Sequence, residues 1–335
     1  MEPKLTVVIP SFNRVNRLKK TLESLVDQSL DKELFEIVIV DDGSDDGTAQ
    51  MVAEFSQKVK HYVRYYWQEK KLAGAARNLG IMEAKAPIVL LMDSDIVPNK
   101  DHLKLHLQLH LKYPETEVAV RGWITPGPEG VDLLRWDESD ILPIGRTVDG
   151  EAIISPEYFV TADVSLKREF LIEAGLFTLG LPAAQDTDLA WRLRDLGLKL
   201  IYCREALAIH TDPLDSVEKV VNNGKKYGWT FAEWYCRIPL YQEETWRLGA
   251  RLNGGWHHFS HHPWGYLKDA IRRWTINSYT IKPILQIAAR IPITNPPKKI
   301  LRRLCKEIWA YYYRHEFYEG RRGDREKDEN DFKRH

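Results

Sequence analysis

Two aspartates separated by one serine, Asp93 and Asp95, follow directly after the apolar run of residues 87–92. Such a run predicts a strand buried on both faces, as in parallel sheets covered by helices. Ligands of open α/β sheets bind at the carboxyl ends of strands, so both carboxylates would face a ligand. Paired carboxylates suit a divalent cation such as Mg²⁺, which often takes phosphate oxygens as further ligands. The triplet is also typical of a polar turn in which Asp95 caps a helix beginning near Asn99.

Other polar residues follow or precede predicted elements in a similar way. Asp41 and Asp42 come after a second apolar run, and Asp186 and Asp188 stand at the start of a predicted helix. Carboxylates at a helix start also serve as caps and favour the positive end of the helix dipole, so a structural role stays open. His210 follows a strand-like segment, where a structural histidine is commoner than a ligand.

The elements that must position these residues alternate between strands and helices. Strands are predicted at residues 5–9, 35–40 and 62–67, with helical patterns between them, which is typical of βαβ units. There is no G-x-G-x-x-G after the first strand and no G-x-x-x-x-G-K-[ST], which argues against a dinucleotide enzyme and a P-loop NTPase. Phosphate would instead be held by a metal on Asp95 and by the cation of Arg77.

Three further segments carry weaker signals. Small residues between Gly74 and Gly80 would let a helix pack closely. Residues 125–150 are rich in proline and glycine and predict a long loop, which in compact domains is usually functional or disordered. Residues 157–166 are predicted to form a strand that finishes near another acid, Asp163.

Together these motifs resemble the inverting family 2 glycosyltransferases of the GT-A fold. The resemblance covers roughly residues 5–212 and rests on segments in the family's order: residues 8–14, 40–44, 76–80, 93–95 and 185–188, and His210. It implies an α/β fold, a GT-A-type nucleotide-sugar-binding α/β/α sandwich with a mostly parallel central sheet, plus a C-terminal helical extension. The catalytic domain would be residues 1–212, with a nucleotide-binding half over 1–95 and an acceptor half over 96–212.

The resemblance also implies a role for each motif residue. Asp41 or Asp42 would accept a hydrogen bond from the base, which favours uracil, thymine or guanine over adenine. Asp95 and His210 would hold Mn²⁺ or Mg²⁺, and Asp186 would be the general base. The other donor contacts would be Pro10, Ser11, Phe12, Arg14, Arg77, Asp93 and Ser94, and the acceptor side would include Asp163, Gln185 and Asp188.

One position departs from the family pattern. Many members have Glu-Asp where this chain has Gln185 and Asp186, which leaves open that Asp188 is the base. The motif Gln-x-x-Arg-Trp of processive synthases is absent, which favours transfer of a single sugar.

The predicted function is therefore metal-dependent inverting transfer of one sugar from a nucleoside-diphosphate sugar, with a UDP-sugar favoured. The acceptor would be a hydroxyl, for instance of a lipid-linked or cell-envelope glycan. An alternative is a catalytically silent sugar- or lipid-binding protein on the same scaffold. A sugar nucleotidyltransferase would need a glycine-rich loop after the first strand, and residues 9–14 contain no glycine.

Composition limits the partners and the compartment. Lys and Arg balance Asp and Glu at 48 each among 335 residues, so no global field indicates a nucleic-acid binder. The three cysteines are far apart, which argues against a disulfide framework and for a reducing compartment. Neither a signal-peptide pattern nor a membrane-spanning run is evident, so a cytoplasmic protein is expected.

The C-terminal third is basic and aromatic. Residues 1–50 carry a net charge of −4, whereas residues 263–306 carry +9. Apolar stripes over residues 264–274 and 301–311 lie beside basic residues and suit the surface of an anionic membrane, on its inner face. The alternative is packing on the catalytic domain or on a partner subunit, and a homodimer stays possible.

The remaining features of this region carry less information. The helical, aromatic and basic region spans residues 213–319, and a charged tail, predicted to be disordered, spans residues 320–335. Residues 254–262 are the one histidine cluster that the sequence suggests, and its spacing does not favour a metal site.

Overall fold

The computed structural model describes residues 2–59, 63–126, 133, 147–148, 151–154, 156–212, 215–237 and 280–291, and part of residues 301–316. The chain divides into two compact units. The first combines residues 1–127 with residues 136–212, and the second combines residues 128–135 with residues 213–335.

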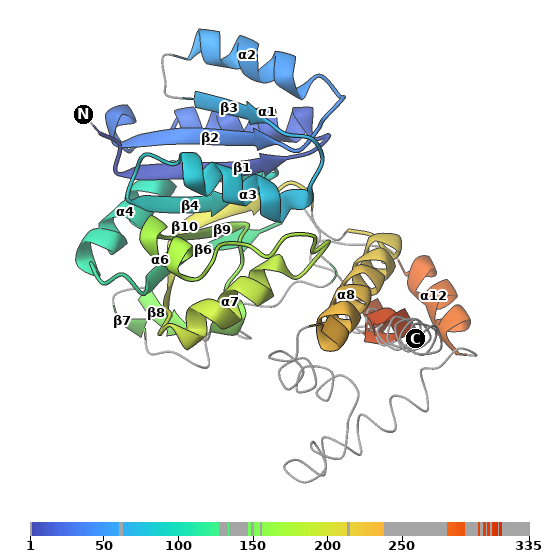
Figure 1. Ribbon diagram of the computed structural model, residues 1–335. Coiled ribbons are helices and arrows are strands. Elements are labelled where there is room, and N and C mark those ends of the chain that lie inside the picture. Colours follow the sequence, from blue (N-terminus) through green and yellow to red (C-terminus); the bar gives the residue numbers. More distant parts are fainter. Residues whose placement is uncertain are drawn as a thin grey trace, which may run out of the picture. The chain divides into compact units, whose positions relative to one another are not determined.

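Strands and helices alternate from β1 to β4 in the first unit, and the order is less regular after β4 (Figure 1). Its strands are β1 (Leu5–Ser11), β2 (Phe35–Asp41), β3 (Val63–Trp67), β4 (Ile88–Met92), β5 (Ile96–Pro98), β6 (Val118–Thr125), β7 (Thr147–Val148), β8 (Glu151–Ile154), β9 (Asp163–Lys167) and β10 (Lys199–His210). Its helices are α1 (Val15–Val26), α2 (Thr48–Lys58), α3 (Leu72–Glu83), α4 (His102–Lys112), α6 (Arg168–Glu173) and α7 (Gln185–Asp195), with 3-10 turns η1 (Lys32–Leu34) and η3 (Pro156–Tyr158).

Both faces of the sheet are covered by helices. Because successive strand residues point to opposite faces, Val8 of β1 packs in a core with α3, α6 and α7. Its neighbours Val7 and Ile9 pack in a second core with α1, α2 and α4. The fold is therefore an α/β/α sandwich, and the predicted fold class is confirmed.

The sheet is mixed rather than mostly parallel. Its described strands run in the order β3-β2-β1-β4-β9-β6-β10-β8-β7, with β5 paired to β10. Neighbours from β3 to β4 are parallel, as are β6 and β10, but β9 is antiparallel to both β4 and β6. Parallel neighbours need a crossover connection, and the described residues between β6 and β9 contain η3 but no crossover helix. The predicted parallel pairing thus holds for only part of the sheet.

Strand β9 also begins at an acid instead of finishing near one. Residues 156–158 form η3, so the predicted strand over 157–166 starts later, at Asp163. Since β9 runs antiparallel to β4, Asp163 lies opposite Met92 at the carboxyl end of β4. The acid therefore still lies at the sheet edge where ligands of this fold class bind.

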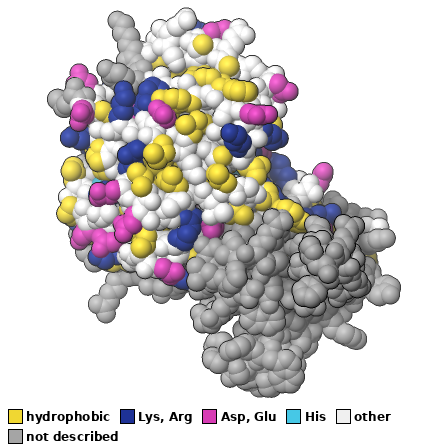
Figure 2. Space-filling model, viewed as in Figure 1, with side chains coloured by type: hydrophobic (Ala, Val, Ile, Leu, Met, Phe, Trp, Pro, Cys, Tyr) yellow, Lys and Arg dark blue, Asp and Glu magenta, His cyan; other side chains and the backbone are white. Residues whose placement is uncertain are grey.

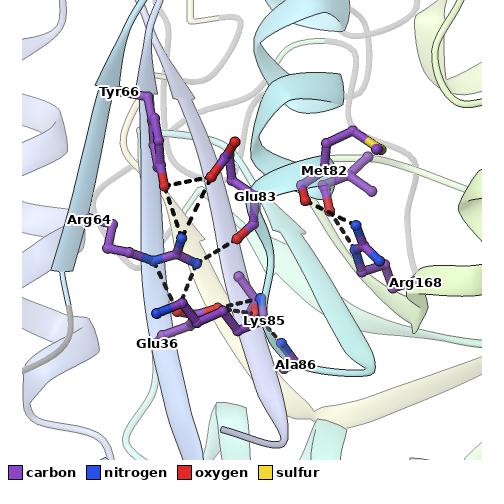
Figure 3. Close-up of polar contacts among 10 residues, drawn as sticks. Glu36, Arg64, Tyr66, Met82, Glu83, Lys85, Ala86 and Arg168 are labelled. Atoms are coloured by element: carbon purple, nitrogen blue, oxygen red, sulfur yellow. Dashed lines mark hydrogen bonds and ion pairs between the residues drawn. The ribbon is translucent and has the colours of Figure 1, made fainter. Parts of the chain in front are cut away.

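Helix α3 packs tightly on the sheet, as its small residues predicted. A Cβ on Gly80 would overlap Cγ1 of Val8, so a side chain there would force the helix away. The guanidinium of Arg168 donates to the carbonyl oxygens of Ile81 and Met82 at 2.8 and 2.9 Å, as Figure 3 shows. These bonds satisfy carbonyls that every helix leaves free at its C-terminus.

A buried ion pair joins β2 and β3 beside this helix end (Figure 3). Arg64 donates to Glu36 from Nε and Nη2 at 3.1 and 2.8 Å, and to the carbonyl oxygen of Glu83 at 2.7 Å. Glu36 also accepts from the Thr6 hydroxyl and the Lys85 amide. Because the carboxylate has several donors, its burial is compensated.

The second unit has an apolar core of its own. Helices α8 (Val217–Arg237) and α12 (Ile281–Arg290) contribute Val220 and Ile281 to a cluster that also holds Leu301 and Ile308. Part of the predicted stripe over residues 301–311 thus packs within this unit. Contact with a membrane, with the catalytic domain or with a partner subunit stays a prediction. The stripe over 264–274, the histidines of 254–262, most of the loop at 125–150 and the tail at 320–335 lie outside the described residues.

Two observations bear on the membrane and charge predictions. Among the described residues, no helix combines the length and the apolar character needed to cross a bilayer. Figure 2 shows basic and acidic side chains interspersed over the described part of the face in view, in keeping with a net charge of zero.

Candidate functional site

The predicted metal ligands meet at the carboxyl ends of the central strands. Asp95 follows β4 and His210 ends β10, and Asp95 Oδ2 lies 3.5 Å from His210 Nε2. Arg14, which follows β1, contacts the same carboxylate oxygen. The Asp95 backbone carbonyl accepts from the amide and the hydroxyl of Thr211, which fixes the two strand ends together.

The environment of Asp95 keeps its carboxyl group ionised. Burial alone would raise its pKa, but the hydrogen bond from His210 and the charge of Arg14 act in the opposite direction, and the net pKa is lowered. Asp95 is not a helix cap, which was the alternative for this triplet, because strand β5 follows it and helix α4 begins only at His102. Arg14 also lies 3.5 Å from a second acid that the sequence did not single out, Asp212.

Arg77 links the two acidic motifs of the site. Its Nη2 donates to Asp93 Oδ1 at 2.6 Å, and its Nη1 donates to Gln185 Oε1 at 2.9 Å. The guanidinium is buried, whereas the Asp93 side chain is about one-third exposed (34%). The carboxylate of Asp93 thus faces solvent while its orientation is set from inside. Ser94 is buried, and its carbonyl oxygen accepts from the Thr21 hydroxyl.

The two aspartates at the start of α7 have different environments. Asp188 is fully buried, and its Oδ2 accepts from Arg192 at 2.6 Å and from the Thr178 hydroxyl at 2.8 Å. Asp186 is half-buried and accepts a hydrogen bond from the amide of Thr187. Burial raises the pKa of Asp186, although the Thr187 bond and the charge of Arg77 oppose the shift. Of the two, Asp186 has the more exposed side chain, whereas Asp188 is paired with an arginine.

The predicted nucleoside contacts lie at the end of β1 and at Asp42. Pro10 and Ser11 are buried in β1, and Phe12 is exposed, with Lys70 Nζ 3.8 Å from its ring centre. Asp42 accepts at Oδ1 from Gln68 and from the amide of Lys71.

Asp41 lies deeper than Asp42 and has a different set of partners. Its two oxygens accept from the Ser44 amide and from the Tyr65 hydroxyl. Both aspartates are buried, but both oxygens of Asp41 accept hydrogen bonds, whereas the bonds from Gln68 and Lys71 use one oxygen of Asp42.

Asp163 does not face the open side of the site. Its side chain is fully buried and contacts His102 and His106 of α4, which the sequence analysis missed. With His110 these histidines recur at every fourth residue, the spacing of one helix face. The spacing of four was the sequence signal that could have indicated this cluster. The prediction that residues 254–262 are the one histidine cluster of the chain was therefore incomplete.

Strained backbone accompanies the functional segments. Asn13, Leu72 and Ala184 all have positive φ, at 50°, 73° and 52°. Asn13 immediately precedes Arg14, Ala184 immediately precedes the Gln185-Asp186 pair, and Leu72 is the first residue of α3, the helix that carries Arg77. Such conformations are costly for residues other than glycine and collect at functional sites.

Comparison with known proteins supports the predicted family. Residues 6–153, which are 148 of the 335 residues, match the model of glycosyl transferase family 2. It is 24% identical over 219 residues to the glycosyltransferase AglE of Haloferax volcanii, covering 62% of this chain and 67% of that protein. The chain spans 51–67% of the length of the first curated relatives that it matches.

Solved structures show the same fold. A mannosyltransferase from Pyrobaculum calidifontis, determined with GDP-Man and Mn²⁺, aligns with a TM-score of 0.63 at 16% identity, over 95% of this chain and 88% of that chain. Residues 1–349 of Staphylococcus aureus TarS, determined with UDP-GlcNAc, align with a TM-score of 0.53 at 17% identity, over 96% and 92%. The predicted family and the GT-A fold are confirmed, while the roles of the individual site residues remain predictions.

Proposed function

We propose that this chain is an active, metal-dependent inverting glycosyltransferase that moves a single sugar from a nucleoside-diphosphate sugar to a hydroxyl acceptor. The observation that carries the proposal is the convergence of Asp95, His210, Asp93 and Asp186 at one edge of the sheet, with Arg77 joining two of the motifs. Asp95 and His210 would hold the cation, Asp93 would contact the sugar, and Asp186 would act as the base.

The base-binding role is best supported for Asp42. A carboxylate there would accept the N–H of uracil or guanine, bases that pair a ring N–H with a neighbouring carbonyl. Asp42 is held by Gln68 and Lys71 through Oδ1, which orients its other oxygen. A UDP-sugar is our first choice of donor, and the GDP-Man of the Pyrobaculum mannosyltransferase makes guanine the competitor to test.

Asp95 and His210 fit a divalent cation. A carboxylate oxygen and an imidazole nitrogen 3.5 Å apart offer two ligands to Mn²⁺ or Mg²⁺, and the diphosphate and water would supply others. Arg14 now neutralises Asp95, and Asp212 is the nearby acid that would receive it. When bound, the ion would act as a Lewis acid that stabilises the departing diphosphate.

Asp186 is the proposed general base. It must take a proton from the acceptor hydroxyl, and a carboxylate with a raised pKa is a better proton acceptor. Asp188 is engaged by Arg192 and Thr178 and is better suited to holding the start of α7. The neutral side chain of Gln185 still accepts a hydrogen bond from Arg77. Because the proposed base is Asp186, having glutamine instead of glutamate at position 185 does not by itself remove the base.

Titration calorimetry with UDP, GDP, TDP and ADP tests the donor site. We expect one nucleotide to bind in the presence of Mn²⁺, with binding lost in chelator and in Asp95→Ala. Asp101→Ala is the control. This exposed aspartate directly precedes α4, accepts a hydrogen bond from the Ser29 hydroxyl, and is not among the residues proposed to bind the donor or the metal. Failure of all four nucleotides to bind would contradict the proposal.

The alternative function, a catalytically silent sugar- or lipid-binding protein, predicts a different result. Such a protein could bind the nucleotide sugar but would release no nucleoside diphosphate in the presence of any acceptor. Release of nucleoside diphosphate from the matching donor, measured with and without a panel of lipid-linked and free glycans, separates the two functions. Dependence on a lipid-linked acceptor would support a peripheral location at the inner face of a membrane.

A further inference from the structure

Two histidines and an aspartate form a buried cluster beneath the candidate donor site. His102 and His106 lie one turn apart on α4, and Asp163 begins β9. Asp163 Oδ1 is 2.9 Å from His102 Nε2 and 3.5 Å from His106 Nε2. One nitrogen or oxygen from each of the three residues lies within 4.8 Å of the other two, and all three side chains have no exposed surface.

The polar atoms of the cluster are incompletely satisfied. Within the described part of the chain, His102 Nδ1, His106 Nε2 and Asp163 Oδ2 are buried without a hydrogen-bond partner. Buried polar atoms nearly always have a partner, so one unpartnered atom on each of these three residues indicates a missing ligand.

The surroundings resemble those of a metal centre. The second ring nitrogen of His106, Nδ1, lies 2.7 Å from the Ser165 hydroxyl, the kind of outer contact that orients metal-bound histidines. A Cβ on Gly122 would overlap Asp163 Oδ2, so the glycine leaves room for the carboxylate. A fully buried carboxylate needs compensating partners, and a bound cation would supply one.

We infer that His102, His106 and Asp163 form a buried binding site for a transition-metal ion, for which Zn²⁺ is the best match. Two imidazole nitrogens and one carboxylate are a common three-residue ligand set for zinc, whereas Mg²⁺ prefers oxygen ligands. The site is separate from the proposed Asp95–His210 site. Asp163 lies opposite Met92, the last residue of β4, and Asp93 follows directly. An ion bound here would therefore hold α4 against β9, next to the strand that Asp93 follows.

The test is the metal content of the purified protein after incubation with Zn²⁺ and gel filtration without nucleotide. We expect one equivalent of zinc in the wild type and in Asp95→Ala, and loss of that equivalent in His106→Gln. His110→Gln is the matched control, because His110 is buried on the same helix face and contacts Ser165 and Lys167. It should keep the zinc. Loss of zinc in Asp95→Ala would assign the ion to the donor site and overturn the inference.

A second measurement covers the case in which His106→Gln does not fold. In the wild type, a zinc-selective chelator should lower Tm by several degrees and added Zn²⁺ should restore it. Replacement by Co²⁺ should give the visible absorption of a four-coordinate site. A metal-free wild type whose Tm responds to neither reagent would overturn the inference and leave a hydrogen-bonded histidine–aspartate pair.

Discussion

The guanidinium of Arg77 donates to Gln185 at 2.9 Å, and with its other nitrogen it donates to Asp93 at 2.6 Å. This single side chain on α3 therefore fixes the loop after β4 relative to the start of α7. These are the two segments that carry the proposed sugar contact and the proposed base. The position of Asp186 relative to the donor thus depends on a buried residue that itself need not react.

We expect Arg77→Lys to weaken both donor binding and folding. A lysine ammonium cannot donate to Asp93 and Gln185 in the same planar arrangement. Loss of a hydrogen bond to a charged group costs about 2–3 kcal/mol of unfolding free energy. Denaturant unfolding and nucleotide titration measure the two effects separately.

Arg168→Lys provides the control for that experiment. Arg168 donates to the last carbonyls of α3 and contacts no proposed donor residue (Figure 3). It should lower stability and leave nucleotide affinity unchanged. Equal loss of affinity in the two variants would mean that Arg77 acts only through general stability.

The two aspartates of α7 should separate into a chemical and a structural residue. Asp186→Asn is expected to lower kcat by about 10²–10⁴-fold, the usual contribution of a general base, with donor affinity and Tm unchanged. Asp188→Asn breaks the buried pair with Arg192 and should cost roughly 3 kcal/mol of stability. Steady-state kinetics and thermal unfolding of both variants decide the assignment, and the reverse pattern would make Asp188 the base.

The raised pKa of Asp186 predicts a pH dependence. A base works only when deprotonated, so kcat/KM should fall as the pH decreases through a pKa above that of an ordinary aspartate. In Gln185→Glu the new carboxylate would pair with Arg77, whose charge now lowers that pKa. The acidic limb of the profile should therefore move to higher pH.

An uncharged replacement distinguishes charge from geometry in this experiment. Gln185→Leu removes the hydrogen bond to Arg77 without adding a carboxylate. Its profile should keep the wild-type limb even if its rate is lower. A limb that moves equally in both variants would show that the amide, and not the charge, controls the base.

The sequence was sufficient for the local elements and for the acids at strand ends. The apolar run before Asp93 and the alternation of strands and helices predicted where β4 ends and which residues gather there. A run of apolar residues predicts a buried strand but does not indicate whether that strand is parallel or antiparallel to its neighbours. The antiparallel pairing of β9 could therefore not be predicted. The burial of Asp163 and its contacts with α4 follow from that direction.

Helix α4 shows a second limit of pattern analysis. Leucines 103, 105, 107 and 109 alternate with polar residues, which is the period of a strand, yet the segment is helical. His102, His106 and His110 lie on its buried side together with leucines. A polar residue at a core position has no signature in hydrophobic periodicity, so the cluster was visible only as a spacing of four.

We expect Leu72→Gly to fold and to be more stable than the wild type. It has φ of 73° at the first residue of α3, a conformation that costs an L-residue about 1–2 kcal/mol, and its side chain is only half-buried. After allowing for the greater chain entropy of glycine, Leu72→Gly should raise stability by about 1 kcal/mol, or Tm by about 2–4 °C. Leu79→Gly, on the same helix with ordinary φ and with its side chain against the core, should instead lower Tm. If both variants lose the same amount of stability, the side-chain contacts of Leu72 offset the cost of its positive φ. The backbone conformation at Leu72 would then not lower the net stability of the protein.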